Sequence, residues 1–102
     1  MTVREKNLAR EIGEAFAIRA REEPIARELW VTVEEYGVHL WLLIDPIGDD
    51  DRELDLYGLV EVLDDQFPEA DYLLHLLNPR DYVGDLRDSL RHDAEQISLR
   101  AN

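Results

Sequence analysis

The chain of 102 residues contains no cysteine. This absence excludes a disulfide framework, a thiolate zinc site, an iron–sulfur cluster and a cysteine nucleophile. The five glycines are isolated from one another, so no glycine-rich loop is available to cradle phosphate groups. Neither Ser89 nor Ser98 lies in a glycine-flanked elbow of the kind that carries a nucleophilic serine. Several common kinds of catalytic site are therefore missing.

Basic residues and long apolar runs are also scarce. There are 11 lysines and arginines against 24 aspartates and glutamates, which gives a formal net charge of −13. Nucleic acid and anionic lipid repel such a charge, so we expect no direct nucleic-acid partner. No run approaches the ~18 apolar residues of a membrane span, and no apolar signal segment follows the first residues. The sequence therefore predicts a cytoplasmic protein without a membrane partner.

The acidic residues are concentrated in the middle of the chain. Residues 1–28 are balanced in charge, whereas residues 29–79 contain 13 acidic residues and one basic residue, Arg52. One interpretation is a solvated acidic surface that keeps the protein soluble. The other is a docking face for a basic partner, of which a DNA mimic would be an extreme form.

What the chain does contain is typical of one folded domain over residues 1–102. Its hydrophobic fraction is 45% and its charged fraction 34%, so only one of the two conditions for disorder is met. The hydrophobic spacing of residues 4–22 predicts a helix that ends before Pro24. The residues expected on the buried face of this helix are Leu8, Ile12, Ala15, Phe16 and Arg19.

Three segments have the pattern of β-strands. Residues 28–35 alternate between apolar and polar side chains, which predicts a strand with one polar face, near an edge of the sheet. Residues 38–44 are almost wholly apolar, so we expect a second strand that is buried on both faces. With Gly37 supplying the turn, the two strands predict an antiparallel hairpin. Residues 71–77 predict a third strand, again buried on both faces.

A helix between the second and third strands determines the topology. It is predicted to begin near residue 50 and to stop at Pro68, with Leu56 and Leu63 on its buried face. A strand–helix–strand unit forms a right-handed crossover, so the second and third strands should run parallel. A short helix over residues 85–92 and a strand over residues 96–100 are expected to follow. The predicted fold is α+β, in the order α-β-β-α-β-(α-β), with a mixed sheet and helices packed on it.

No residue pattern in the chain meets the requirements of a metal site. Counted from Asp49 as an EF-hand loop, the sixth residue is Leu54 and the twelfth is Val60, where glycine and glutamate are needed. His39 and His75 lie on strands expected to be neighbours or near neighbours, but two histidines fall short of the three or four ligands of a metal site. We therefore predict no metal, no cofactor and no catalytic residue.

A binding pocket is still expected from the parallel strands. Ligands of open α/β sheets bind at the carboxyl ends of such strands. The candidate pocket residues on this basis are His39, Trp41, Asp45, Asp71 and His75. Aromatic residues on strands belong to the core more often than to a ligand platform, so both interpretations of Trp41 are kept.

Residues 38–46, the acidic helix after them, the stop at Phe67 and Pro68, and residues 70–77 resemble the small nucleotidyltransferase domains. These domains occur in minimal bacterial nucleotidyltransferases and their toxin–antitoxin relatives. In that family a strand with an Asp-x-Asp motif leads through a helix to a strand with a third carboxylate. Here His39 and Trp41 stand at the Asp-x-Asp positions, Asp71 is the only acid near the third, and the Gly-Ser turn is missing. The resemblance therefore implies a catalytically inactive relative, because magnesium requires oxygen ligands.

The sequence thus favours a non-catalytic protein-interaction module, with an antitoxin-like or scaffold role and a protein partner. Two alternatives remain open at this point. One is an enzyme of unrecognised type, with its pocket at the carboxyl ends of the parallel strands. The other is a self-associating structural protein, a homo-oligomer joined through a sheet edge or a helix face.

Overall fold

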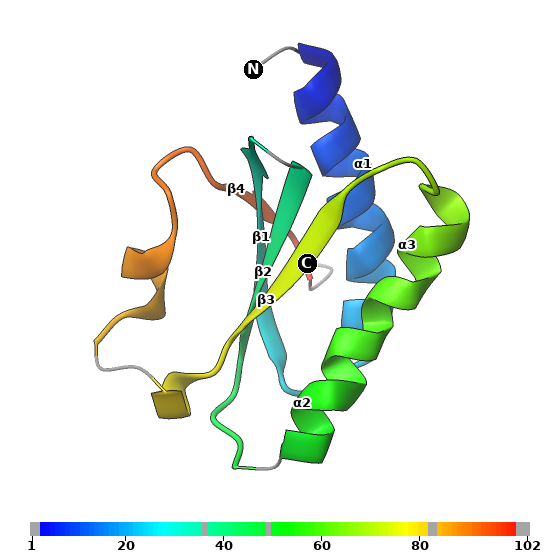
Figure 1. The fold of residues 1–102 in the computed structure, drawn as a ribbon. Coiled ribbons are helices and arrows are strands. Elements are labelled where there is room, and N and C mark those ends of the chain that lie inside the picture. The colour runs from blue at the N-terminus through cyan, green and yellow to red at the C-terminus, as the bar shows by residue number, and fades with distance from the viewer. Residues whose placement is uncertain (1–2, 36, 49, 82–83, 100–102) are drawn as a thin grey trace.

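A computed structural model describes residues 3–35, 37–48, 50–81 and 84–99, and it confirms the α+β fold (Figure 1). A four-stranded mixed sheet has the order β3-β2-β1-β4. The elements in chain order are α1 (Val3–Ala20), β1 (Ala26–Glu34), β2 (Gly37–Ile44), α2 (Asp50–Tyr57), the 3₁₀ helix η1 (Gly58–Val60), α3 (Glu61–Gln66), β3 (Tyr72–Leu77), the 3₁₀ helices η2 (Pro79–Asp81) and η3 (Leu86–Ser89), and β4 (Glu95–Ile97). No helix among the described residues is long and apolar enough to span a membrane.

The strand pairing follows the predicted topology at β1, β2 and β3. The strands β1 and β2 form the expected antiparallel hairpin, with Trp30 opposite Trp41. Gly37 begins β2 with a φ of 138°, and a Cβ there would lie 2.5 Å from the carbonyl oxygen of Asp71, so only glycine fits. After the crossover through α2 and α3, β3 runs parallel to β2, with His75 beside Trp41.

The prediction that β1 lies near an edge is wrong. The strand is central because β4, far along the chain, pairs with it on the side away from β2. Only the middle of β1 is paired in this way, with Leu29 opposite Ile97 and Val31 opposite Glu95. The polar residues of β1 therefore mark one face of the sheet and not an edge of it.

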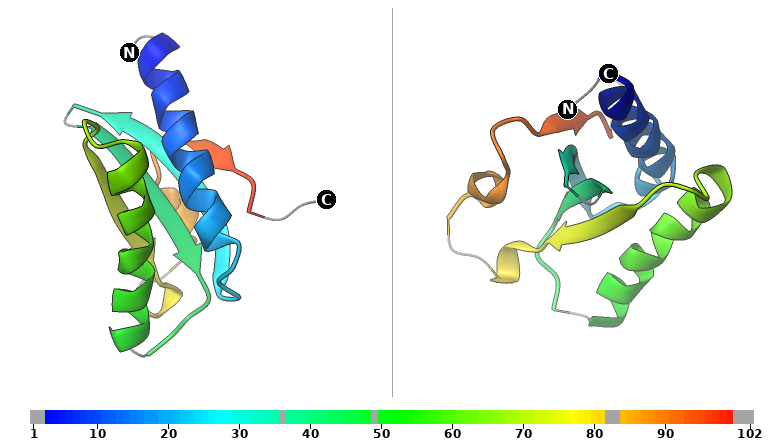
Figure 2. Two further views of the ribbon diagram at one scale, coloured as in Figure 1. Left: turned by 90° about the vertical axis from the view of Figure 1, so that its right-hand side faces the viewer. Right: turned by 45° about the horizontal axis from the view of Figure 1, so that its top comes forward.

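The helices lie on one face of the sheet, and the chain between β3 and β4 crosses the other (Figures 1 and 2). We call these the helical face and the polar face. The apolar core lies between the sheet and the helices, where Phe16, Leu42 and Leu63 are fully buried. On the polar face the buried apolar residues among those the structure describes are Leu43 and Leu77, which pack against Trp30, Trp41 and Leu90.

The expectation that β2 and β3 are buried on both faces is therefore wrong. Along β2, Leu40 and Leu42 are buried on the helical face, whereas His39 and Trp41 are half-buried on the polar face. On β3, Leu73 remains 53% exposed. The described residues between β3 and β4 leave these side chains of the polar face partly exposed.

The buried face of α1 also differs from the prediction. Leu8 is 37% exposed and Arg19 is exposed, whereas Ala9 and Ala17 are buried beside Phe16. The small residues on this face allow α1 to lie close to the sheet. At Gly13 a Cβ would approach the Cγ1 atoms of Val31 and Ile97 to 2.9 Å.

The crossover helix and the C-terminal segment have more irregular geometry than expected. The single helix predicted after residue 50 is interrupted by η1, yet Leu56 and Leu63 on either side of η1 are both fully buried. The short helix expected over residues 85–92 is the 3₁₀ helix η3, and the expected terminal strand is the three-residue β4. The EF-hand test position Asp49 lies outside the described residues.

Candidate functional site

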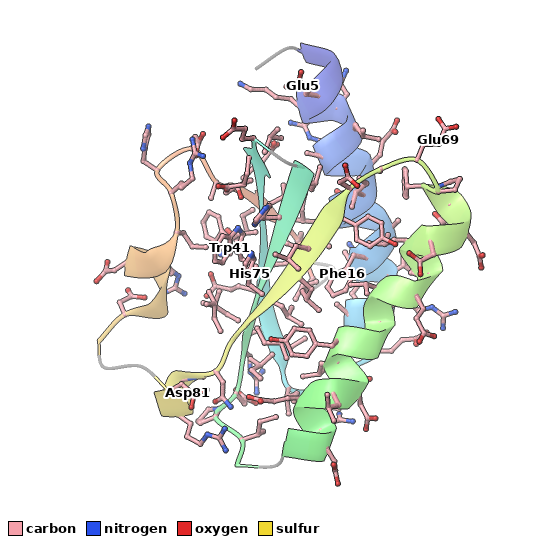
Figure 3. All side chains as sticks on the ribbon, in the orientation of Figure 1. Glu5, Phe16, Trp41, Glu69, His75 and Asp81 are labelled. Atoms are coloured by element: carbon pink, nitrogen blue, oxygen red, sulfur yellow. The ribbon has the colours of Figure 1, made fainter. Side chains whose placement is uncertain are left out.

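Five side chains from β1, β2 and β3 form a connected cluster on the polar face, where Figure 3 shows Trp41 and His75 next to each other. We call them the polar-face cluster, and its members are Thr32, Glu34, His39, Trp41 and His75. Side chains at alternate positions of a strand point to the same face. The two members on β1 and the two on β2 are each two residues apart, and His75 on β3 is paired with Trp41, so all five lie together opposite the helices.

Three aromatic rings stack across β2 and β3. The rings of Trp41 and His75 lie 3.9 Å apart between centroids, at an interplanar angle of 13°. The ring of His39 stacks on that of His75 at 4.9 Å, and Nδ1 of His39 lies 2.8 Å from Nε2 of His75. One of these two nitrogens carries the hydrogen and donates a hydrogen bond, and the other accepts it. Each histidine therefore supplies a hydrogen-bond partner for the other.

A hydrogen-bonded chain connects this stack to a carboxylate on β1. The indole Nε1–H of Trp41 donates to the hydroxyl oxygen of Thr32 at 3.0 Å. The hydroxyl of Thr32, which is buried, donates in turn to Glu34 at 2.6 Å. Arg91 approaches the other oxygen of Glu34 at 3.4 Å. Because Thr32 is only 3% exposed, its hydroxyl is poorly placed to reach a substrate as a nucleophile.

The charges of the cluster are set by these contacts. The hydrogen bond from Thr32 lowers the pKa of Glu34, and the nearby charges of His39 and Arg91 lower it further. Burial lowers the pKa of His75, and the charge of His39 acts in the same direction against the opposing effect of Glu34. At neutral pH the cluster therefore holds an ionised carboxylate and a neutral His75.

Arginines from the segment before β4 tie that segment to the polar face. Arg87 forms a two-pronged ion pair with Glu28, and Glu28 also accepts a hydrogen bond from Trp30 at 3.3 Å. Sequence reasoning missed Glu28, Glu34 and both arginines as members of this face. The available signal was the polar alternation along β1, but nothing in the sequence shows which arginines reach it.

Four of the five predicted pocket residues lie near one another, and Asp45 does not. His39, Trp41 and His75 are in the polar-face cluster, and Asp71 lines a pocket with His39 at the amino end of β3, whereas Asp45 lies at the other end of the sheet. Since β2 and β3 are parallel, Asp45 follows the carboxyl end of β2 and Asp71 precedes the amino end of β3. The five candidates therefore do not line one common pocket.

Each of the two separated aspartates has a local role. Asp45 forms a two-pronged ion pair with Arg27, both bonds 2.6 Å long, and these bonds lower the pKa of Asp45. The carbonyl oxygen of Asp71 accepts a 2.9 Å hydrogen bond from the backbone of Val38. Both contacts hold backbone segments in place.

The carboxyl ends of the parallel strands, where a ligand was expected, are occupied by Asn78. This residue is 1% exposed, and its amide nitrogen donates to the Ile47 carbonyl at 2.8 Å and to Glu53 at 2.9 Å. Its side-chain oxygen accepts from the backbone N–H groups of Ile47 and Arg80. Asn78 therefore fastens the loop after β2 over the strand ends.

The described residues contain no group of three or more histidine, aspartate or glutamate side chains arranged to hold a metal ion. No protein-family model, curated protein or solved structure matches the chain. The resemblance to nucleotidyltransferases therefore stays a prediction. The positions that would carry Asp-x-Asp, His39 and Trp41, are part of the ring stack on the polar face.

Proposed function

We propose that the protein is a non-catalytic interaction module of the cytoplasm that binds a basic protein partner through an acidic surface on α2, α3 and the turn before β3. The observation that carries this proposal is the uneven distribution of ion pairs over the molecule. Scaffold and antitoxin-like roles both depend on such a surface. An inactive relative of the nucleotidyltransferases would serve either role without turnover.

The arginines are already paired, and the pairs concentrate away from this surface. Every arginine from residue 10 to residue 91 has an acidic partner within 4.0 Å. These partners lie on α1 and the turn after it, on β1, after β2, between β3 and β4 and on β4, and one of them, Glu53, lies on α2. The protein therefore has few of its own cations left to neutralise further acids.

The acidic surface has no such partners. It is defined by Asp55, Glu61, Asp65, Glu69 and Asp71, all of which are exposed. Within the described part of the chain none of the five forms an ion pair. These carboxylates keep their negative charge without an ion-pair partner among the described residues, so a basic partner would be attracted to them and steered towards them.

The two alternative functions have less support from the geometry. An enzyme with its pocket at the carboxyl ends of β2 and β3 would need space that the loop fastened by Asn78 now covers. A self-associating protein would have to bring two chains of net charge −13 together. A separate basic partner meets neither difficulty.

The test compares two variants of equal charge. The first, D55N/E61Q/E69Q, neutralises part of the acidic surface, and the control, E11Q/E14Q/E22Q, neutralises the same number of acids on α1 and in the turn after it. A partner captured from the source cells is purified, and its affinity for each protein is measured by calorimetry at several salt concentrations. We expect the first variant to weaken binding about tenfold or more, equivalent to ~1.4 kcal/mol, and the control to bind like the wild type. Equal affinity of both variants would contradict the proposal.

A further inference from the structure

We infer that the partner docks by adding an extended, basic segment as a fifth strand along the free edge of β3. This inference rests on the proposed function and specifies how the partner is held. In the order β3-β2-β1-β4, β3 is an outer strand that pairs only with β2 among the described residues. Its other side therefore presents backbone groups without a strand partner.

The direction of these backbone groups follows from the pairing with β2. The backbone N–H of Val38 donates to the carbonyl of Asp71, so alternate residues from Asp71 onward direct their backbone groups towards β2. The residues between them direct their N–H and C=O groups outward, and these are Tyr72, Leu74 and Leu76. In the described structure no backbone hydrogen bond outside the β2–β3 ladder involves these three residues.

The two edges of the sheet differ in how they are protected. Natural sheet edges are shielded by lysine, proline, bulges or a short strand. The opposite edge, β4, is three residues long. By contrast β3 has six residues, YLLHLL, without lysine or proline, and its register with β2 is unbroken from Val38 to Leu43. Leu73 adds an apolar side chain, 53% exposed, that a neighbouring strand would cover.

The charge around this edge selects the occupant. Asp64 accepts a hydrogen bond from the Tyr72 hydroxyl, which places it over the beginning of β3, and Glu69 and Asp71 come directly before the strand. A second copy paired through β3 would bring the same acids of both chains towards one another. An extended segment with lysine or arginine at the end beside Tyr72 would neutralise them instead.

The test uses a nine-residue peptide of alternating valine and threonine with two lysines at each end. Its matched control has the same sequence, with N-methyl groups on alternate backbone nitrogens, so that charge is retained and one row of donors is removed. Amide hydrogen exchange of the protein is followed by NMR. At saturating peptide we expect the N–H groups of Tyr72, Leu74 and Leu76 to exchange at about one tenth of their rate in the free protein or slower. The exchange rates of the N–H groups of Leu73 and His75 should change little. The N-methylated peptide should give no such pattern.

A pair of protein variants tests the same edge from the other side. Leu76→Pro removes an outward N–H but no donor to β2, and Leu76→Val keeps that N–H. We expect the proline variant to lose peptide binding and the valine variant to retain it. If the proline variant does not fold, the comparison of the two peptides decides the question alone.

The remaining outcomes separate this inference from the proposed function. Equal binding of both peptides would overturn strand addition and leave the acidic surface as a purely electrostatic site. No protection at the three outward amides with either peptide would also overturn strand addition. A dimer of the free protein that Leu76→Pro abolishes would assign the edge to a second copy. If D55N/E61Q/E69Q bound the natural partner as tightly as the wild type, this result would count against the proposed function itself.

Discussion

The two faces of the sheet are held by different kinds of interaction. The helical face is a continuous apolar layer in which side chains such as Phe16, Leu42 and Leu63 are fully buried. The polar face is held by ring stacking, by hydrogen bonds such as that between Trp41 and Thr32, and by ion pairs. On the helical face the stability of the fold therefore depends on how well the side chains fill the core. On the polar face it depends on the geometry of the hydrogen bonds and ring contacts and on the charges of the side chains. The responses of the two faces to mutation and to pH should differ accordingly.

The largest effect is expected from a cavity on the helical face. Leu63→Ala should lower the free energy of unfolding by about 2–5 kcal/mol, because Leu63 is fully buried between α3 and the sheet. Urea denaturation followed by circular dichroism measures the change. The control is Leu54→Ala on the same helical segment, where Leu54 is 67% exposed and the change should stay within about 0.5 kcal/mol. Similar losses at both positions would show that α3 does not pack as described.

Overpacking of the same face should have a somewhat smaller effect. Gly13→Ala puts a methyl group 2.9 Å from side-chain atoms of Val31 and Ile97, and we expect a loss of about 1–3 kcal/mol. At Gly58 no atom lies within 4 Å of such a methyl group, so Gly58→Ala should be neutral or stabilising by up to about 1 kcal/mol. Thermal unfolding of the two variants distinguishes them. A stabilised Gly13→Ala would mean that α1 lies further from the sheet.

On the polar face the loss of one hydrogen bond should cost less than a core cavity. Trp41→Phe keeps a ring against His75 but removes the indole donor to Thr32, and we expect a loss of about 1–2 kcal/mol. The double variant with Thr32→Val should lose less than the sum of the single variants, because the two groups interact directly. Additive losses in this double-mutant cycle would argue against the bond.

The smallest effect, and the one confined to the polar face, concerns pH. The pKa of His75 is lowered by burial, so its neutral form stabilises the fold above the ordinary histidine pKa, and this contribution falls as the pH drops below it. Between about pH 7.5 and about pH 5.5, wild type should therefore lose stability relative to His75→Gln. Urea midpoints at the two pH values give the comparison. Parallel curves for the two proteins would show that His75 is not shielded from solvent. Leu63→Ala should keep the full wild-type pH dependence.

Elements with strong local periodicity were predictable from the sequence. The helix α1, the hairpin of β1 and β2 and the parallel crossover to β3 were each confirmed. The buried face of α1 was not, because Ala9, Gly13 and Ala17 carry little hydrophobic signal although their small size permits close packing. The central place of β1 depends on a three-residue pairing with β4, which no local pattern near β1 encodes.

The candidate site was predictable only as far as strand geometry allows. The contact between His39 and His75 follows from placing two apolar strands side by side in parallel. Asp45 and Asp71 lie far apart, because parallel strands carry the residue after one and the residue before the other to opposite ends of the sheet. The contacts of Arg87 and Arg91 depend on the path of an irregular segment, which side-chain patterns do not specify.

The contact of α1 with β4 has a consequence for the order in which the chain folds during synthesis. Arg10 pairs with Glu95, Arg21 donates to the carbonyl of Ser98, and Gly13 lies against Ile97. Each contact joins residues made early to residues made more than 70 positions later. The hairpin can form as soon as it leaves the ribosome, but α1 must wait for β4 before its packing surface is complete. A nascent chain stalled before residue 95 should therefore expose part of the inner side of its first helix to chaperones.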